Sequence, residues 1–386
     1  MNETNSITED KNDPPQSQSF YLPELDILRF FAFFAVLIHH CFSSDLTSYQ
    51  GKLAPFANFI VGIVVSGGFG VDLFFALSSY LITELLIREE EKKGKINAPA
   101  FYMRRALRIF PLYYTFVLLS IFVFPYFFSK SAPLDLTYSI GFLFFVGNWV
   151  CSIYGFPKSF ADPLWSVSIE EQFYITFPFL IMFLGVKRLK LLVVIFIVLA
   201  IISRIMLAVN GAGYVAVWCN SFARLDPIAG GILLALLLRS GHLKPIRNFF
   251  LRFLVGTFSV GLIIFSAMSF NFFGYQSIFS YSIVALGSTL LIWSVINPNK
   301  LKSKYYEPLI YLGRISYGLY VVHMLSLTLA DYVIDYIGVS SSLWVIWRLL
   351  MSTIISIIIA SISYSLIKKP FLKLKKRFTF VESRPL

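Results

Sequence analysis

The chain has 386 residues, of which 57% are hydrophobic and only 14% charged. This balance would leave a soluble globule with large exposed apolar patches, so the sequence predicts an integral membrane protein. The formal net charge of +12 also occurs in nucleic-acid-binding proteins, but here the basic residues form short clusters between apolar segments, the pattern that sets membrane orientation. We therefore expect no nucleic-acid partner.

The first twenty residues are polar and include several acids. They lack the basic start and apolar core of a secretory signal peptide, so residues 1–20 are predicted to be a short disordered cytosolic tail. Residues 21–372 are the expected transmembrane domain, and residues 373–386 a short basic cytosolic tail. The three cysteines are scattered without metal-ligand spacing, which predicts neither a disulfide framework nor a metal site.

Apolar segments of spanning length predict an all-α polytopic membrane protein with about ten transmembrane helices. They begin near residues 25, 61, 109, 168, 190, 224, 249, 277, 308 and 343. A shorter segment at 139–150 is expected to be re-entrant or interfacial, because counting it as a span would move Lys187, Arg188 and Lys190 away from the side that holds the other basic clusters. Both termini are then expected in the cytosol.

Two ionisable residues lie in the first apolar segment. Arg29 and His40 are eleven positions apart, so on a helix they share one face and are separated by about 16 Å along the axis. Ionisable residues at membrane depth are candidates for function. The alternative is that Arg29 extends to the lipid headgroups and that His40 is a hydrogen-bonded core histidine. This segment alone does not decide between the two interpretations.

A basic cluster precedes the third apolar segment. Arg104, Arg105 and Arg108 occur in FYMRRALRIFPLYY at 101–114, and Arg104 and Arg108 share a helix face. Guanidinium groups bind phosphate bidentately, so the cluster is a candidate site for a nucleotide-bearing donor such as coenzyme A. The simpler interpretation is that these cations only set membrane orientation.

Three glycines at 67, 68 and 70 precede a helical segment that carries Asp72. Such glycines permit close approach of a helix or a ligand, and helix packing is the favoured interpretation. Asp72 either orients an imidazole or caps the helix.

Adjacent carboxylates occur at Glu170 and Glu171 within DPLWSVSIEEQFYITFPFL at 162–180. Neighbouring helix positions diverge by about 100°, so only one of the two is expected to face a pocket. An acid at this depth must be paired or protonated, and Arg224, close to Asp226 in the sequence, is a candidate partner. A structural ion pair explains these residues as well as catalysis does.

A polar stripe recurs at every third position of LGRISYGLYVVHMLSL at 312–327, at Tyr317, Tyr320 and His323. It lines either a cavity or a helix contact. Four further charged residues receive no function from the sequence: Arg204, Asp331, Asp335 and Arg348.

Taken in order, these segments resemble the acyltransferase-3 family of membrane-bound O-acyltransferases, which modify bacterial surface glycans and some small molecules. The resemblance runs from about Leu25 to Phe371. It rests on LDILRFFAFFAVLIHH, GFGVDLFFALSSYLIT, RRALRIFPLYY, LWSVSIEEQFY and LGRISYGLYVVH. It implies a multi-pass protein of the bacterial cytoplasmic (inner) membrane, with an acyl-CoA, by default acetyl-CoA, as donor and a glycan or lipid-linked glycan as acceptor. No metal is expected, and the oligomeric state is left open.

Carried over residue by residue, the resemblance implies a cytosolic acyl-CoA whose phosphates lie near three cations: Arg29, Arg105 and Arg108. It selects His40, rather than its neighbour His39, as the catalytic imidazole, which acts as a general base or carries the acyl group. Glu170 or Asp72 orients this imidazole, with Glu170 favoured. The substrate pocket is expected to include Glu171, Arg224, Tyr317 and His323.

Two other functions fit a helix bundle with buried charge. A transporter or flippase for a glycolipid predicts two halves of matching hydropathy, and the sequence has no such symmetry. A transmembrane acyl relay would pass the acyl group to a separate periplasmic transferase, and we expect it to need a partner protein. Direct transfer to the acceptor is the first choice and the relay the second.

Overall fold

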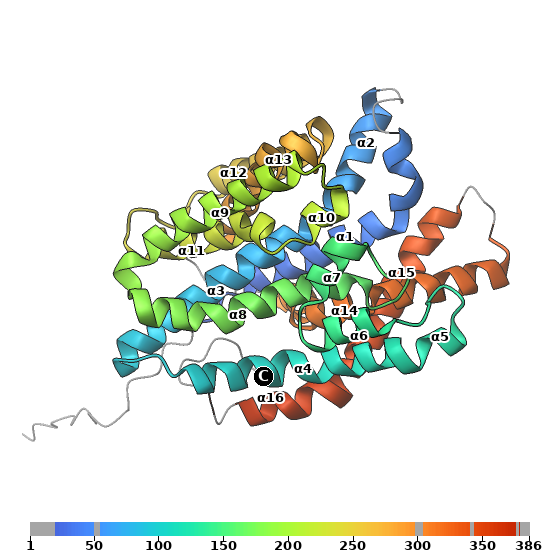
Figure 1. Cartoon of the computed structure of the whole chain (residues 1–386), viewed down its shortest axis with the longest axis horizontal. Coiled ribbons are helices and arrows are strands. Elements are labelled where there is room, and N and C mark those ends of the chain that lie inside the picture. Colours follow the sequence, from blue (N-terminus) through green and yellow to red (C-terminus); the bar gives the residue numbers. More distant parts are fainter. Residues whose placement is uncertain (1–19, 50–54, 298–303, 340–342, 376–377, 379–386) are drawn as a thin grey trace, which may run out of the picture.

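The computed structural model describes residues 20–49, 55–297, 304–339, 343–375 and 378. The predicted tails at 1–20 and 373–386 lie almost wholly outside these residues. The described chain contains helices and no strand (Figure 1). The α-helices are α1 (Pro23–Tyr49), α2 (Pro55–Ser66), α3 (Gly70–Lys93), α4 (Ala98–Phe122), α5 (Phe124–Phe127), α6 (Leu136–Leu143), α7 (Gly147–Tyr154), α8 (Trp165–Leu184), α9 (Leu189–Val209), α10 (Tyr214–Trp218), α11 (Leu225–Arg239), α12 (Phe249–Ser269), α13 (Ser277–Val295), α14 (Glu307–Ile337), α15 (Trp344–Ser363) and α16 (Lys369–Lys375).

Nine helical runs in the described part of the chain are long and apolar enough to cross a membrane. The predicted segment near residue 224 corresponds to α11, whose 15 residues extend about 22 Å, less than the roughly 30 Å of a hydrocarbon core. Of the ten predicted segments, α11 is therefore the one that is not among these nine runs, and it packs against α3 and α9 inside the bundle. The all-α polytopic fold class is confirmed.

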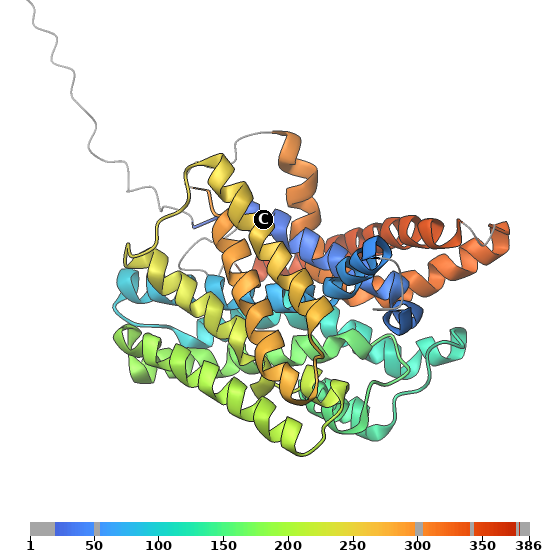
Figure 2. The ribbon, with the colours of Figure 1, turned by 90° about the horizontal axis from the view of Figure 1, so that it is seen from above.

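Three turns that carry basic residues lie together at one end of the bundle, on the left in Figures 1 and 2. They are the turns at 94–97, 185–188 and 240–248, and we call this end the basic end. The first turn shows how the sequence builds it. Gly94 ends α3 in the left-handed conformation (φ 70°), which a residue without a Cβ adopts at no steric cost, and the Asn97 side chain then caps α4 by accepting from the Ala100 N–H.

The short apolar segment at 139–150 does not form a spanning helix. It is broken into α6 and α7, each about 12 Å long from its eight residues. The Tyr138 hydroxyl donates to the Gly155 carbonyl at 2.9 Å, so the two outer ends of this hairpin meet. The segment therefore returns to the end at which it started, as predicted. The turn between α6 and α7 is bound to α8, because the Gln172 side-chain amide donates to the Phe145 carbonyl at 2.8 Å.

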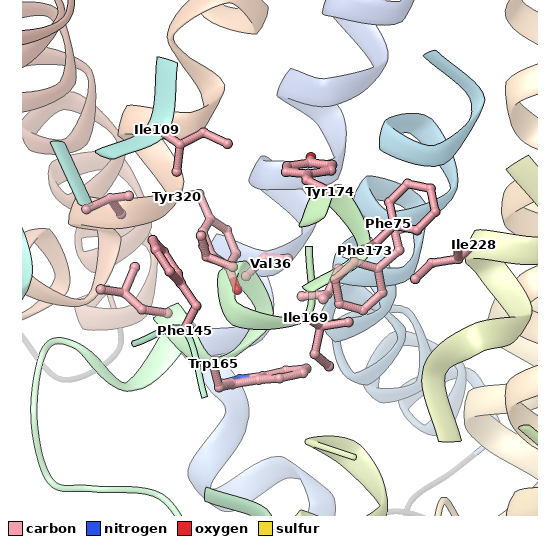
Figure 3. Packing of buried hydrophobic residues seen from close by; sticks show 14 of the residues in the cluster. Val36, Phe75, Ile109, Phe145, Trp165, Ile169, Phe173, Tyr174, Ile228 and Tyr320 are labelled. Carbon is pink, nitrogen blue, oxygen red and sulfur yellow. The ribbon is translucent and has the colours of Figure 1, made fainter. Parts of the chain in front are cut away.

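Glycines bring α1 into close contact with α3 and α14. A Cβ on Gly70 would collide with the Ala32 carbonyl, and one on Gly313 with the Asp26 carbonyl. Helices in a membrane gain little from the hydrophobic effect, so close backbone approach at small residues is a main source of their association. The predicted packing role of the glycines is confirmed for Gly70. The same contacts fix α1 beside α14, with buried side chains from α3, α8 and α14 around it (Figure 3).

Candidate functional site

A cavity of about 1040 Å³, its opening included, lies among α1, α3, α4, α8 and α14. Its wall on α3 runs from Leu85, near the basic end, to Val71, which is about 21 Å along the helix axis. At the deep end, the Tyr320 hydroxyl and the Ser166 hydroxyl hydrogen bond to each other at 2.6 Å. The cavity therefore extends into the bundle from the basic end to the hydrogen-bonded pair Tyr320 and Ser166, which we call the polar plug.

Three guanidinium groups line this cavity, and all three were predicted from the sequence. Arg29 is paired with Asp26 on the same helix at 3.2 Å. Arg105 and Arg108 make no ion pair or hydrogen bond with any residue that the structure describes, although both face the cavity. The Arg105 guanidinium lies between the rings of Phe101 and Tyr174, with centroids 5.4 and 5.5 Å away. Such a pair of cations is a site for an anion.

The third arginine of the basic cluster lies elsewhere. Arg104 binds Glu89 at 2.6 Å and the Phe378 carbonyl at 2.7 Å. It does not line the cavity. The structure thus separates a structural arginine from its two cavity-lining neighbours, which membrane orientation alone would not require.

The two adjacent carboxylates of α8 diverge, as their helical spacing predicts. Glu170 lines the cavity, accepts a hydrogen bond from the Tyr174 hydroxyl at 2.7 Å and interacts electrostatically with Arg29 and Arg108. Glu171 is buried outside the cavity wall, and its Oε1 has no hydrogen-bond partner among the described residues. Neither carboxylate pairs with Arg224, so that predicted ion pair is wrong.

His40 lies beyond the deep end of the cavity and not in its wall. Its ring faces His323 of α14, with centroids 5.1 Å apart. His323 is one helical turn beyond Tyr320, and the centroids of these two rings are 5.4 Å apart. The imidazole pair therefore sits directly behind the polar plug. Arg29 thus lines the cavity and His40 contacts His323 of α14 behind it.

His39 points to a different neighbour. Its Nδ1 lies 3.3 Å from the Val64 carbonyl of α2, and its ring is also close to Gly68. His39 and His40 thus have separate surroundings although their ring centroids are 5.3 Å apart.

Asp72 and Arg224 form a buried ion pair at 2.6 Å instead of serving the cavity. Both side chains are fully buried, and the Arg224 guanidinium stacks on Trp218 and Tyr281 with centroid distances of 4.3 and 4.7 Å. The expectation that Asp72 orients an imidazole, and that Arg224 lines the pocket, is corrected: the two charges are buried together and neutralise each other.

A second buried pair adjoins the first. Arg204 binds Asp226 at 2.9 Å, and Ser282 bridges them by accepting from Arg204 at 3.0 Å and donating to Asp226 at 2.8 Å. We call Asp72, Arg204, Arg224 and Asp226 the ion-pair cluster. Another pair, Arg348 with Asp331 at 2.7 Å, joins α15 to α14, and Arg348 also donates to the Cys41 carbonyl beside His40 at 2.6 Å.

Of the predicted pocket residues, only Tyr317 lines the cavity, and its hydroxyl donates to the Ile109 carbonyl at 3.3 Å. Glu171, Arg224 and His323 do not. Sequence reasoning missed Asp26, Ser78 and Tyr174 as cavity residues. Asp26 carried a usable signal, because it is three positions before Arg29 on the same helix.

The described residues include no group of three or more histidine, cysteine, aspartate or glutamate side chains placed to hold a metal ion.

The burial of Cys219, between α10 and α11, raises the pKa of its thiol well above the usual range. This cysteine is therefore a poor nucleophile.

A model of the acyltransferase domain matches residues 22–363. The chain is 29% identical to the peptidoglycan O-acetyltransferase OatA of Listeria monocytogenes over 374 residues, which are 92% of this chain and 56% of the relative. It is also 29% identical to the O-acetyltransferase OatA of Staphylococcus aureus over 387 residues, covering 94% of this chain and 59% of the relative. The chain thus spans less than two thirds of the length of these relatives. No solved structure matches it.

Proposed function

The chain belongs to the acyltransferase-3 family, and we propose that it is a membrane O-acetyltransferase that moves an acetyl group from cytosolic acetyl-CoA to a hydroxyl of a cell-surface glycan. The observation that carries this proposal is the pair Arg105 and Arg108, which line the cavity without a partner among the described residues. Partly buried cations that form neither an ion pair nor a hydrogen bond within the protein are stabilised when an anion binds them.

The donor's chemistry fits the cavity from one end to the other. The phosphates of coenzyme A would bind Arg29, Arg105 and Arg108, whose planar donors suit phosphate oxygens. The pantetheine arm would then lie along the apolar stretch of the wall, at Phe74, Phe75 and Ile109. The thioester would then lie towards the hydroxyls of Tyr320 and Ser166, with His40 and His323 behind them.

In the proposed chemical step, His40 is the general base. The free nitrogen of His40 takes the proton of the acceptor hydroxyl while the oxygen attacks the thioester carbonyl. The carbon–sulfur bond breaks, and His40 returns the proton to the departing sulfur. A hydroxyl and a thioester thus become an ester and a thiol.

The side of donor entry follows from charge. The basic turns lie at the end at which the cavity begins, and cytosolic loops carry an excess of lysine and arginine. We assign the basic end and both termini to the cytosol of a bacterial inner membrane. The acceptor would then reach His40 from the opposite end, or laterally from the lipid, and the His40 side chain is indeed partly exposed.

The acceptor to test first is peptidoglycan, because that is the acceptor named for the Listeria relative. The experiment uses the purified full-length chain in phospholipid vesicles, supplied with radiolabelled acetyl-CoA and soluble peptidoglycan fragments. Alkali-labile label on the fragments is the expected result. Label that is released from acetyl-CoA but retained by the protein would favour the acyl relay. Absence of both in folded protein that binds no coenzyme A would overturn the proposal.

A further inference from the structure

His323 has the surroundings of a functional histidine and not of a packing residue. It is fully buried on α14, its ring contacts that of His40, and it makes an edge-on contact with Phe33 at a centroid distance of 6.4 Å. Packing against α1 would be served as well by an apolar side chain, so the polarity of this position needs a separate explanation.

The hydrogen bond of His323 fixes its tautomer. Nδ1 lies 2.5 Å from the Tyr320 carbonyl oxygen. A carbonyl can only accept, so Nδ1 must carry the proton, and in a neutral imidazole Nε2 is then an acceptor with a free lone pair. This Nε2 is buried and has no hydrogen-bond partner among the residues that the structure describes. A buried acceptor without a donor is destabilising, so this nitrogen is expected to accept a hydrogen bond in some functional state.

We propose that His323 is the positioning residue of His40, and this inference rests on the proposed function. In the reactive arrangement Nε2 of His323 accepts the N–H of His40. This bond fixes the His40 tautomer, so that its other nitrogen presents a lone pair to the acceptor hydroxyl. His323 keeps its own Nδ1 proton throughout, and its lone pair stabilises the imidazolium that His40 becomes.

The carboxylates that the sequence offered for this role are engaged elsewhere. Asp72 is bound by Arg224, and Glu170 accepts from Tyr174 within the cavity. No described carboxylate forms an ion pair with His40. His323 therefore replaces Glu170 and Asp72, the two residues that the sequence offered for orienting the imidazole.

Two substitutions separate positioning from packing, because each preserves a different nitrogen of the ring. His323→Asn keeps a donor near the Nδ1 position, for the Tyr320 carbonyl, and loses the acceptor that faces His40. His323→Gln reaches the Nε2 position and restores an acceptor there. We expect His323→Asn to lower kcat by about 10²-fold with the KM for acetyl-CoA unchanged, whereas His323→Gln stays within about tenfold of the parent.

The matched control is His39→Asn, which alters the other imidazole beside His40 and should change kcat by less than about threefold, since His39 contacts α2 instead. Wild-type rates in His323→Asn would overturn the inference. Equal losses in the Asn and Gln variants would do the same, because they indicate packing alone.

A readout independent of activity keeps this inference separate from the proposed function. The chain has only four histidines, so nitrogen NMR of isotope-labelled histidine can assign their tautomers in detergent-solubilised protein. We expect His323 to be protonated at Nδ1 and His40 to populate a single tautomer, which becomes a mixture in His323→Asn. A His323 protonated at Nε2, or a His40 spectrum unchanged by the substitution, would refute the positioning role even if acetyl transfer is observed. Failure of transfer with these tautomers intact would count against the proposed function alone.

Discussion

The cavity and the ion-pair cluster both place arginines and carboxylates inside the bundle, but they satisfy these charges differently. In the ion-pair cluster each arginine has its own aspartate, as in the 2.6 Å contact between Arg224 and Asp72. In the cavity, Arg105 and Arg108 form no ion pair or hydrogen bond with any described carboxylate, and Glu170 acts on Arg108 only through space. A charge that is paired inside the protein holds helices together, whereas an unpaired one is available to a ligand. Whether a buried charge is paired therefore shows whether it joins helices or is available to a ligand, and the residue type alone does not show this.

The largest effect on activity is expected at His40, behind the cavity. His40→Ala should reduce acetyl transfer by roughly 10²- to 10⁴-fold, the usual loss of a general base, with expression and membrane insertion unchanged. His39→Ala should retain substantial activity, because its ring faces α2. Ester-linked acetate on extracted glycan measures both. An inactive His39 variant beside an active His40 variant would mean that the catalytic face of α1 is wrongly assigned.

The ion-pair cluster should respond in stability. Asp72→Ala leaves the Arg224 charge buried without its partner, which typically costs about 3 to 5 kcal/mol. Unfolding by SDS, followed by tryptophan fluorescence, would report the loss. The double variant Asp72→Leu with Arg224→Met removes both charges and should recover most of it. If the double variant folds well but no longer binds coenzyme A, the cluster belongs to the donor site and the contrast with the cavity fails.

The cavity arginines should respond in donor binding. Arg105→Ala and Arg108→Ala each remove a charge-assisted phosphate contact, worth about 1.5 to 3 kcal/mol, and should raise the Kd for coenzyme A by roughly 10- to 150-fold. Isothermal titration calorimetry on folded protein measures this. Arg104→Ala is the control, because its guanidinium already binds Glu89, and its Kd should change by less than about threefold. Equal effects at all three positions would point to general electrostatics.

The sequence predicted the fold well because a membrane helix can be recognised from the length and apolarity of its segment. It also predicted that the segment at 139–150 is re-entrant or interfacial and does not cross, because three basic residues further on would otherwise lie on the wrong side. The site was only partly accessible. Helical spacing identifies Arg29 and His40 as sharing a face and Glu170 and Glu171 as diverging, because these relations lie within one helix.

Relations between helices were not accessible in the same way. The sequence could not show that Asp72 of α3 meets Arg224, more than 150 positions away, nor that Arg104 is engaged by Glu89 while Arg105 is not. These partnerships depend on how helices cross, and the crossings are set by glycine contacts and loop lengths that leave many alternatives open.

The smallest effect, and the one with the most informative sign, is expected at Glu170. Its carboxylate faces the same cavity as Arg29 and Arg108, so it opposes an incoming phosphate. Glu170→Gln should tighten coenzyme A binding by about 1 kcal/mol, or roughly fivefold, because a like charge is removed at near-constant shape. Glu171→Gln is the control, since that residue is buried outside the cavity wall, and it should leave the Kd unchanged. A Glu170→Gln variant with unaltered Kd and a kcat lowered 10²-fold would instead place this carboxylate on the catalytic imidazole, as the sequence alone had favoured, and would remove the reason for assigning that role to His323.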